Sequence, residues 1–357
     1  MNIRQLLELT ISRDASDIHL IVGSPPTLRI NGELIPIQGA GDLTEPDIQG
    51  LIFPILTEYQ KKVLTENWEL DMGLEYENRA RFRVNVYRQR GKMAASLRLI
   101  PRKIRTLEET GIPQAATHLT ELKQGLVLVT GPTGHGKSTT LASFINQINM
   151  SRADHIITIE DPVEFIYPKG KSLISQRELN SDTKTWGNAL KAALREDPDV
   201  VLVGEMRDLD TISATMTIAE TGHLVFATLH TNSAAQTIDR IIDVFPENQQ
   251  PQIRAQLAAV MEAIISLRLM PTIVPGRTLA AEVLFGVPAT RSLIRDGKTH
   301  LIDNLIQTSA EIGMVSMENS LANLVRAGKI TTTTALNYTL KPQVLNKLLA
   351  TSSSLNK

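Results

Sequence analysis

The chain has 357 residues, a formal net charge of −1 and no cysteine. Its length allows two domains, and 42% hydrophobic against 21% charged residues indicates a folded chain. The lack of cysteine excludes disulfides, cysteine-based zinc sites and thiol chemistry. A net charge near zero means that no overall electrostatic field attracts nucleic acid, so we expect no nucleic-acid partner. The sequence shows neither a membrane-spanning apolar run nor a signal peptide, which predicts a cytoplasmic protein.

The first hundred residues predict a small α+β domain with helices against an antiparallel sheet. Asn31-Gly32 between two apolar runs is typical of a type I′ hairpin turn. Thr44 followed by Glu45-Pro46-Asp47 is typical of a capped helix start. The predicted helices lie at 3–7, 45–55 and 59–66, and the predicted strands at 15–22, 27–30, 33–37, 79–88 and 93–100.

Basic residues occupy one face of the strand predicted at 79–88. Apolar residues alternate there with polar ones that include Arg81 and Arg83, and the next strand carries Arg98. Three interpretations stay open. The arginines form a solvated strand face, they bind nucleic acid together with interleaved aromatic residues, or Arg83 or Arg98 contacts a bound nucleotide as an arginine finger.

Residues 101–113 are polar and contain proline and glycine, which predicts a linker between two domains. After it, a predicted buried strand at 126–130 and a predicted helix at 139–145 flank the sequence Gly-x-x-x-x-Gly-Lys-Ser. This setting predicts a P-loop that binds a nucleoside triphosphate. We expect Lys137 to reach the β- and γ-phosphates and Ser138 to ligate Mg²⁺. The candidate nucleotide-binding residues are Gly131, Pro132, Thr133, Gly134, His135, Gly136, Lys137, Ser138 and Thr139.

Acidic residues follow two further predicted strands. The strand at 156–159 leads into Glu160-Asp161-Pro162-Val163-Glu164, where an acid can orient or deprotonate a water that attacks the γ-phosphate. The strand at 200–203 leads into Gly204-Glu205, the place of a Walker B acid. Glycine stands where an aspartate is common, so we expect Glu205 to act on Mg²⁺ through a water.

His223 and His230 flank a fourth predicted strand at 224–229. The location of polar residues at strand ends favours nucleotide sensing for both histidines, against an ordinary core or surface role. Metal binding by this pair is disfavoured because cysteines are absent and no carboxylate stands nearby in the sequence. Further elements are predicted as helices at 186–194, 208–222 and 252–270, a strand pair around 280–285, and a helical region at 289–349.

Together these segments resemble the secretion-ATPase superfamily of hexameric motors and, within it, the type IV pilus retraction ATPases (PilT-like). The resemblance covers nearly the whole chain. The matching segments are 131–138 as Walker A, 159–165 as the Asp box, 203–208 as an atypical Walker B, 221–232 as the His box and 289–296 as the retraction motif. In the last segment Thr290 and Asp296 depart from the usual Ile and Glu.

This resemblance implies an α/β architecture: a PAS-like N-terminal domain over residues 1–100, then a RecA-like P-loop ATPase domain over 114–357 that includes the C-terminal helices. It implies that Glu164 is the general base and that Glu205 acts on the Mg²⁺ site. His223 and His230 are then nucleotide sensors. Arg83 and Arg98, fifteen positions apart on paired strands, match the family's arginine-finger pair.

The resemblance also implies a homohexamer that hydrolyses ATP to drive pilus retraction at the inner face of the cytoplasmic membrane. Its expected partners are copies of itself, an inner-membrane pilus platform protein and an accessory retraction ATPase. The alternatives are a pilus-extension or type II secretion ATPase, a weakly active accessory retraction paralogue, and a DNA-translocating ATPase. The first is disfavoured because such relatives usually carry a further N-terminal domain and often a four-cysteine metal insertion.

Overall fold

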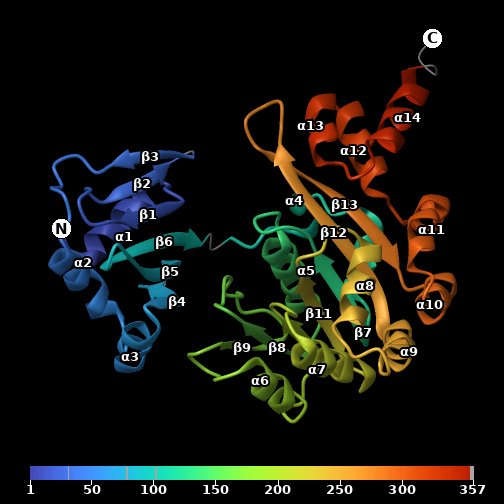
Figure 1. Cartoon of the computed structure of the whole chain (residues 1–357), viewed down its shortest axis with the longest axis horizontal. Helices are drawn as coiled ribbons and strands as arrows, with labels where there is room; N and C mark the ends of the chain where they lie inside the picture. Colours follow the sequence, from blue (N-terminus) through green and yellow to red (C-terminus); the bar gives the residue numbers. More distant parts are fainter. Residues whose placement is uncertain (31, 78, 101–102, 354–357) are drawn as a thin grey trace. The chain divides into compact units, whose positions relative to one another are not determined.

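The computed structural model describes residues 1–30, 32–77, 79–100 and 103–353 (Figure 1). The chain divides into two compact units, Met1–Lys103 with Asp161–Ile166, and Ile104–Glu160 with Tyr167–Lys357. The division near residue 103 falls within the predicted linker 101–113, although Pro101 and Arg102 of that linker lie outside the described residues. Asn31 of the predicted hairpin turn and residues 354–357 of the C-terminal tail also lie outside them.

Within the described residues, the first unit forms a six-stranded antiparallel sheet in the order β3-β2-β1-β6-β5-β4 (Figure 1). Helices pack on it, so the predicted α+β organisation is confirmed, whereas β4 was not predicted. The elements are α1 (Ile3–Ser12), β1 (Asp17–Leu20), β2 (Thr27–Ile30), β3 (Glu33–Pro36), α2 (Glu45–Ile52), α3 (Glu58–Asn67), β4 (Glu69–Tyr76), β5 (Ala80–Gln89) and β6 (Lys92–Ile100).

Local sequence explains these elements. Thr44 accepts a hydrogen bond from the Asp47 backbone N–H, and the Asp47 side chain accepts one from the Thr44 backbone N–H, which forms a capping box at the start of α2. Along β5 the alternation places Phe82, Val84 and Val86 in the core at 0% exposure. The intervening residues of β5 therefore face away from that core, and they include the arginines.

In the described part of the second unit, the strands form a seven-stranded sheet in the order β13-β12-β7-β11-β10-β8-β9. Neighbours are parallel except β12 and β13, which are antiparallel. The strands are β7 (Gly125–Thr130), β8 (His155–Glu160), β9 (Leu173–Glu178), β10 (Val200–Val203), β11 (Leu224–Leu229), β12 (Met261–Pro271) and β13 (Arg277–Phe285). Strand order reverses beside β7, the topological switch point at which open α/β sheets bind ligands.

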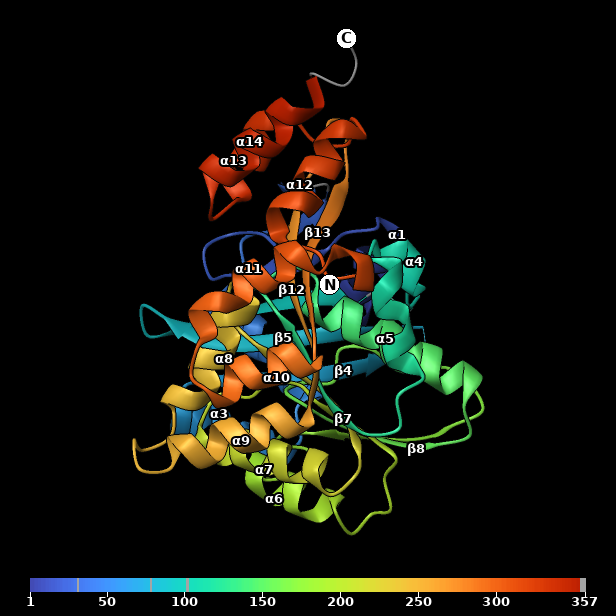
Figure 2. The same cartoon turned by 90° about the vertical axis from the view of Figure 1, so that its right-hand side faces the viewer.

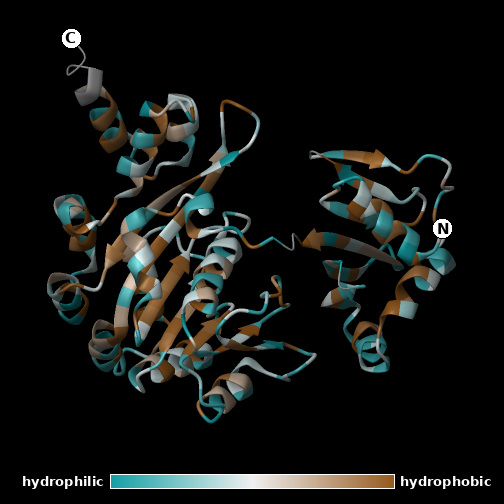
Figure 3. Cartoon of the chain, turned by 180° about the vertical axis from the view of Figure 1, so that it is seen from behind, coloured by the Kyte–Doolittle hydropathy of each residue, from teal (hydrophilic) through white to brown (hydrophobic). Residues whose placement is uncertain are grey.

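Helices cover both faces of this sheet. Figure 2 shows α5 (Lys137–Ser151) on one side of β7 and β12, and α8 (Ala234–Asp243) and α9 (Gln250–Val260) on the other. The shorter α4 (Leu107–Thr110) packs near α5, while α6 (Trp186–Ala193) and α7 (Leu209–Glu220) complete the crossovers between β8, β10 and β11. Every residue of β7, β10 and β11 is buried, and Figure 3 shows apolar strands inside more polar helices. These strands are apolar throughout because both of their faces are covered.

The C-terminal region is helical, as predicted. It comprises α10 (Pro288–Arg295), α11 (Ile302–Thr308), α12 (Met317–Arg326), α13 (Thr332–Tyr338) and α14 (Pro342–Ser353). Part of it packs as a small separate core on the ends of β12 and β13, where Met270 and Ala280 meet Leu321 and Leu345. Within the described residues, no helix has the length and apolar character needed to cross a membrane.

The helix predicted at 252–270 is wrong in its second half. Helix α9 ends at Val260, and the chain continues directly as β12 from Met261 to Pro271. A continuous apolar run does not distinguish a buried helix from a strand buried on both faces. Here pairing with β7 on one side and β13 on the other makes the run a strand. Strand β9 and helix α8 were also not predicted.

Candidate active site

The P-loop joins the carboxyl end of β7 to α5 and rests against β12. Gly131 has φ +140°, and a Cβ there would lie 2.6 Å from the Leu267 carbonyl oxygen, so only glycine allows this close approach. Gly136 is the N-cap of α5, and among the described residues no side chain caps that helix. By contrast, Thr44, Thr57 and Asp208 cap α2, α3 and α7. The first turn of α5 is therefore arranged to donate N–H groups to an anion.

Lys137 is buried beneath the loop and holds it by backbone contacts. Its Nζ donates to the Gly131 carbonyl at 2.8 Å and to the Pro132 carbonyl at 3.1 Å, and lies 3.3 Å from His230 Nδ1. An ammonium can only donate, so His230 Nδ1 is the acceptor and its Nε2 carries the proton. Thr133 Oγ1 lies 3.5 Å from the same Nδ1.

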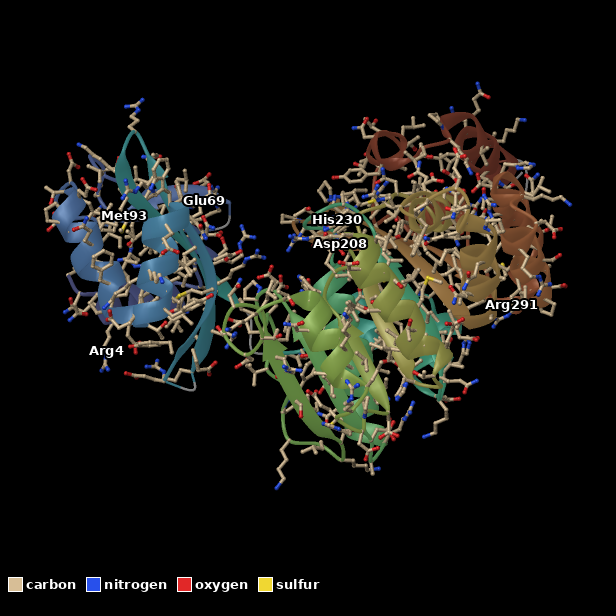
Figure 4. All side chains as sticks on the ribbon, turned by 60° about the horizontal axis from the view of Figure 1, so that its bottom comes forward. Arg4, Glu69, Met93, Asp208, His230 and Arg291 are labelled. Atoms are coloured by element: carbon tan, nitrogen blue, oxygen red, sulfur yellow. The ribbon has the colours of Figure 1, made fainter. Side chains whose placement is uncertain are left out.

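Glu205 completes this cluster from the end of β10. His230 Nε2 lies 3.4 Å from Glu205 Oε1, and Arg207 Nε lies 2.9 Å from Glu205 Oε2. Strands β10 and β11 are parallel neighbours, so the residues after both strands meet at one edge. Figure 4 shows His230 beside Asp208, the N-cap of α7, at that edge. The predicted meeting of the P-loop with Glu205 and His230 is seen in the structure.

Space is limited around Gly204, which stands where an aspartate is common. A Cβ on Gly204 would lie 3.1 Å from the Ile159 carbonyl oxygen and 3.3 Å from the Glu160 Cα. A side chain at this position would therefore require β8 to shift by a few tenths of an ångström. The carboxylate at this strand end belongs to Glu205, one residue further along the chain.

His223 lies at the opposite edge of the sheet. It precedes β11, and its carbonyl accepts from the N–H of Gly125, the first residue of β7. The six residues of β11 place it about 20 Å from His230 along the strand. His230 therefore lies at the end of β11 that faces the P-loop, and His223 lies at the opposite end. Nucleotide sensing by either histidine stays a prediction.

Glu164 belongs to the first compact unit, since the segment Asp161–Ile166 clusters with it. There Arg83 Nη1 lies 3.6 Å from Glu164 Oε1, and Arg81 Nε donates to the Val163 carbonyl at 2.7 Å. The predicted general base and one predicted arginine finger therefore form an ion pair within this unit. The placement of Glu164 beside the P-loop stays a prediction.

Arg83 and Arg98 are direct cross-strand partners on β5 and β6. Arg83 Nη2 and Nε donate to Asp71 Oδ2 at 2.6 and 3.1 Å, and Arg98 Nε donates to Asp17 Oδ1 at 2.8 Å. The Asp71 hydrogen bonds, with smaller charge effects from Asp71 and Glu164, outweigh burial and raise the pKa of Arg83. Sequence reasoning missed both aspartates. Asp71 carried a signal, because it is the polar position between buried Leu70 and Met72.

His135 links the P-loop to β12, a contact that the motif did not predict. Its Nδ1 accepts from the Leu269 backbone N–H at 3.2 Å, and its ring lies 6.2 Å from that of Tyr338. Burial, and then the positive charges of Arg268 and Lys137, lower the pKa of His135. The ring therefore stays neutral, which the hydrogen bond to Nδ1 requires.

A magnesium site can be assessed from the donor set. Ser138 is exposed on the first turn of α5, and the Glu205 carboxylate is partly exposed. Across residues 1–30, 32–77, 79–100 and 103–353, no group of three or more His, Cys, Asp or Glu could hold a metal ion. Mg²⁺ suits such a site because it takes one or two protein ligands together with phosphate oxygens and waters.

The family described as "Type II/IV secretion system protein" matches residues 2–345. The chain belongs to this family. It is 44% identical over 330 residues to the "Type IV pilus retractation ATPase PilT" of Pseudomonas aeruginosa, covering 92% of this chain and 96% of that protein. It is also 44% identical to a "Twitching motility protein" of Neisseria gonorrhoeae, covering 92% and 88%.

Solved structures support the same family assignment. The crystal structure of the pilus retraction motor PilT with bound ADP superposes with a TM-score of 0.90 at 44% identity, covering 97% of this chain and 99% of that chain. The ATPase DotB of Legionella pneumophila superposes at 0.83 with 27% identity, covering 94% and 95%. The predicted resemblance to pilus retraction ATPases is confirmed, and the mixed α/β fold is that of the secretion ATPases.

The segment 289–296, which resembles the retraction motif, lies mostly on α10, and its Arg291 lies away from His230 (Figure 4). Arg291 donates to the carbonyls of Ala258 and Ala259 at 2.7 Å each and pairs with Glu262 at 2.7 Å. It therefore satisfies the last carbonyls of α9 where the chain turns into β12. Thr290, which departs from the usual Ile, is fully buried and donates to the Phe285 carbonyl at 2.7 Å.

Proposed function

We propose that this chain is the ATP-hydrolysing subunit of a motor that retracts type IV pili and so drives twitching motility. The observation that carries the proposal is the cluster in which Lys137, His230 and Glu205 lie 3.3 to 3.4 Å apart beside the uncapped start of α5. The 44% identity to a pilus retraction ATPase over 92% of the chain supports retraction as the motor's task.

In this proposal the phosphates of ATP occupy the first turn of α5. Lys137 exchanges its backbone carbonyl contacts for β- and γ-phosphate oxygens, and His230 contacts the γ-phosphate. Ser138 would hold Mg²⁺, with Glu205 acting on it through a water. When bound, the ion neutralises phosphate charge and orients the terminal phosphate. His230 already bridges Lys137 and Glu205, so a change at the phosphate reaches both neighbours.

Hydrolysis then requires residues of the first unit. We assign Glu164 as the general base for the attacking water, and Arg83 and Arg98 as the cations that stabilise charge on the γ-phosphate. We further assign the first unit as PAS-like and the second as RecA-like, with domains at 1–100 and 114–357. His223 is not part of this assignment, because it lies at the other edge of the sheet.

The proposed working form is a homohexamer at the inner face of the cytoplasmic membrane. An inner-membrane pilus platform protein is its proposed mechanical partner. An accessory retraction ATPase is a further one, and the chain is 36% identical to the "Type IV pilus ATPase PilU" of Pseudomonas aeruginosa, covering 95% of this chain and 88% of that protein. Loss of phosphate on hydrolysis would release the arginines and let the two units move, which is the mechanical step.

Phosphate release by the purified full chain tests the enzymatic part. We expect turnover that Glu164→Ala abolishes and that Glu75→Ala, an exposed acid near Arg81, leaves within about twofold. Undiminished turnover in Glu164→Ala would reject the base assignment. A wild-type chain that binds ATP without releasing phosphate would favour the accessory paralogue.

Deletion of the gene tests the biological direction of force. We expect cells that accumulate surface pili and lose twitching, because pili are built and not withdrawn. Complementation with the wild-type chain should restore twitching, and complementation with Lys137→Ala should not. Cells without pili would instead identify an extension motor.

A further inference from the structure

Glu282 is a buried carboxylate that the proposed nucleotide chemistry does not use. It interrupts the buried apolar run of β13, and only 4% of its surface is exposed. Its Oε1 accepts a hydrogen bond of 2.8 Å from the backbone N–H of Ala234. Burying a carboxylate costs free energy unless hydrogen bonds or opposite charges stabilise it, so the groups around Glu282 must account for its burial.

Glu282 ends a row of polar residues that begins next to the P-loop. Thr130, the last residue of β7, pairs in register with Ser266 of β12, and Ser266 pairs in register with Glu282 of β13. Register partners point to the same face of a sheet. Thr130 Oγ1 donates to Ser266 Oγ at 2.9 Å, so the row starts with a direct contact one residue before Gly131.

The backbone N–H that donates to Glu282 belongs to Ala234, the first residue of α8, and the segment 230–233 (the His230 segment) leads into this helix. Ser233 is the N-cap, and Ala234 is the first helical residue. The segment after His230 is itself fixed to α8. Thr231 Oγ1 lies 2.6 Å from Thr237 Oγ1, and the Asn232 N–H donates to Gln236 Oε1 at 3.2 Å. The position of His230 therefore depends on where α8 begins.

Charged groups from several elements face Glu282. Burial is the largest effect and raises its pKa to about 7. The Ala234 hydrogen bond and Lys341, which precedes α14, favour the ionised form, while Asp303 of α11 and Glu318 of α12 oppose it. On β12, burial lowers the pKa of Arg268, and the charge of Glu282 opposes this effect. Arg268 is in turn one of the charges that lower the pKa of His135.

We propose that Glu282 is a positioning residue for nucleotide sensing: through the Ala234 N–H it fixes the start of α8 and thereby holds His230 on Lys137 and Glu205. The ionised carboxylate accepts the stronger hydrogen bond, because charge assistance about doubles the strength of such a bond. The hydrogen bond to Glu282 therefore fixes the start of α8 more tightly above neutral pH than below it. This inference rests on the proposed ATPase function.

Hydrogen–deuterium exchange of the full chain, with ATP turnover beside it, tests the proposal. Glu282→Gln keeps an acceptor oxygen but no charge. Ala234→Pro removes the N–H at the first helical position, where proline is favoured, and Ser233 already has the extended backbone that precedes a proline. Glu318→Gln is the matched control, since Glu318 is 2% exposed and bonds to Thr339 instead.

At pH 8 we expect residues 230–238 of Glu282→Gln to exchange about fivefold faster than in the wild type. We expect kcat to fall about fivefold in Glu282→Gln and Ala234→Pro, with KM for ATP within about twofold, because the P-loop is unchanged. At pH 6 the difference between Glu282→Gln and the wild type should shrink below about twofold. Glu318→Gln should match the wild type at pH 8. At pH 6 it should exchange no faster than the wild type, because Glu318 no longer opposes the charge on Glu282.

Equal exchange in Glu282→Gln and the wild type at pH 8 would overturn the proposal. So would a difference that is the same at pH 6 and pH 8, since that indicates a structural role without the charge. A wild-type chain without ATP turnover would reject the proposed function, and the exchange comparison would still decide whether Glu282 holds the His230 segment.

Discussion

The cations at the nucleotide edge of the second unit and those on the sheet of the first unit have different partners. Lys137 contacts the neutral carbonyls of Gly131 and Pro132 and the His230 ring. Arg83 and Arg98 each contact a carboxylate, Asp71 and Asp17. Under the proposed function, a phosphate at the lysine replaces the contacts with these two carbonyls, whereas at the arginines it competes with carboxylates.

Under the proposed function, these different contacts have a consequence for a motor. Lys137 exchanges its contacts with the Gly131 and Pro132 carbonyls for phosphate oxygens when nucleotide binds. Arg83 and Arg98 are paired with carboxylates, and Arg83 also contacts Glu164. To bind a phosphate, each arginine must exchange one anionic partner for another. Under the proposed function, the lysine provides steady binding, and the arginines provide charge that depends on the state of the cycle.

Arg83→Ala is the strongest way to break this comparison. We expect ATP turnover to fall about 1,000-fold, the scale of a lost arginine finger. Arg79→Ala is the matched control, because Arg79 pairs with Glu8 and not with Glu164. Phosphate release decides between the two interpretations: turnover within threefold of the wild type would confine Arg83 to a structural role in the first unit.

Lys137→Ala tests the other side of the comparison. We expect turnover to fall several hundred-fold, in the range reported for removing one preorganised charge donor, about 10² to 10³. Binding of a fluorescent ATP analogue should weaken in parallel. Lys123→Ala is the control, since Lys123 is exposed near Asp154 and precedes β7, whereas the P-loop follows that strand. Retained turnover in Lys137→Ala would contradict the P-loop assignment.

Glu282 extends the comparison to an anion whose partner is a neutral N–H. Its folded pKa of about 7 lies above the ordinary 4.5, so the unfolded chain loses this proton first as pH rises. The free energy of unfolding should therefore fall between pH 4.5 and 7, by about 3 kcal/mol in total, and then level off. Urea unfolding at pH 5 and pH 8 should show this loss in the wild type and a smaller loss in Glu318→Gln, where one charge that raises the pKa of Glu282 is gone. Glu282→Gln should lack it, and an unchanged pH dependence would refute the buried charge.

Arg291 and Arg295 lie on the same helix, α10, and allow a comparison between an arginine that contacts backbone carbonyls and an exposed one. Arg291→Ala leaves the carbonyls of Ala258 and Ala259 without their donor and should lower the free energy of unfolding by about 2 kcal/mol. Arg295 is exposed, so Arg295→Ala should change stability by less than about 0.5 kcal/mol. Thermal melts measure both. Equal stability of the two variants would mean that the Arg291 contacts contribute little.

The sequence pattern predicted the structure correctly where the signal depends on neighbouring residues. The capping box at Thr44, the alternation of β5 and the Gly-x-x-x-x-Gly-Lys-Ser loop each depend on neighbouring residues, and all appear in the structure. The run 261–271 could not be assigned in this way. An apolar stretch becomes helix or strand according to what covers it, and here β7 and β13 lie on either side.

The sequence by itself predicted a P-loop after β7 and placed Glu205 and His230 directly after two further strands, because strand, loop and helix signals are short-range. Only the tertiary structure decided which partners the charges have. Asp71 lies 12 residues from Arg83, Asp17 lies 81 from Arg98, and Glu282 lies 48 from Ala234. Strand order and register bring these groups together, and no local pattern encodes a contact between residues so far apart in the chain.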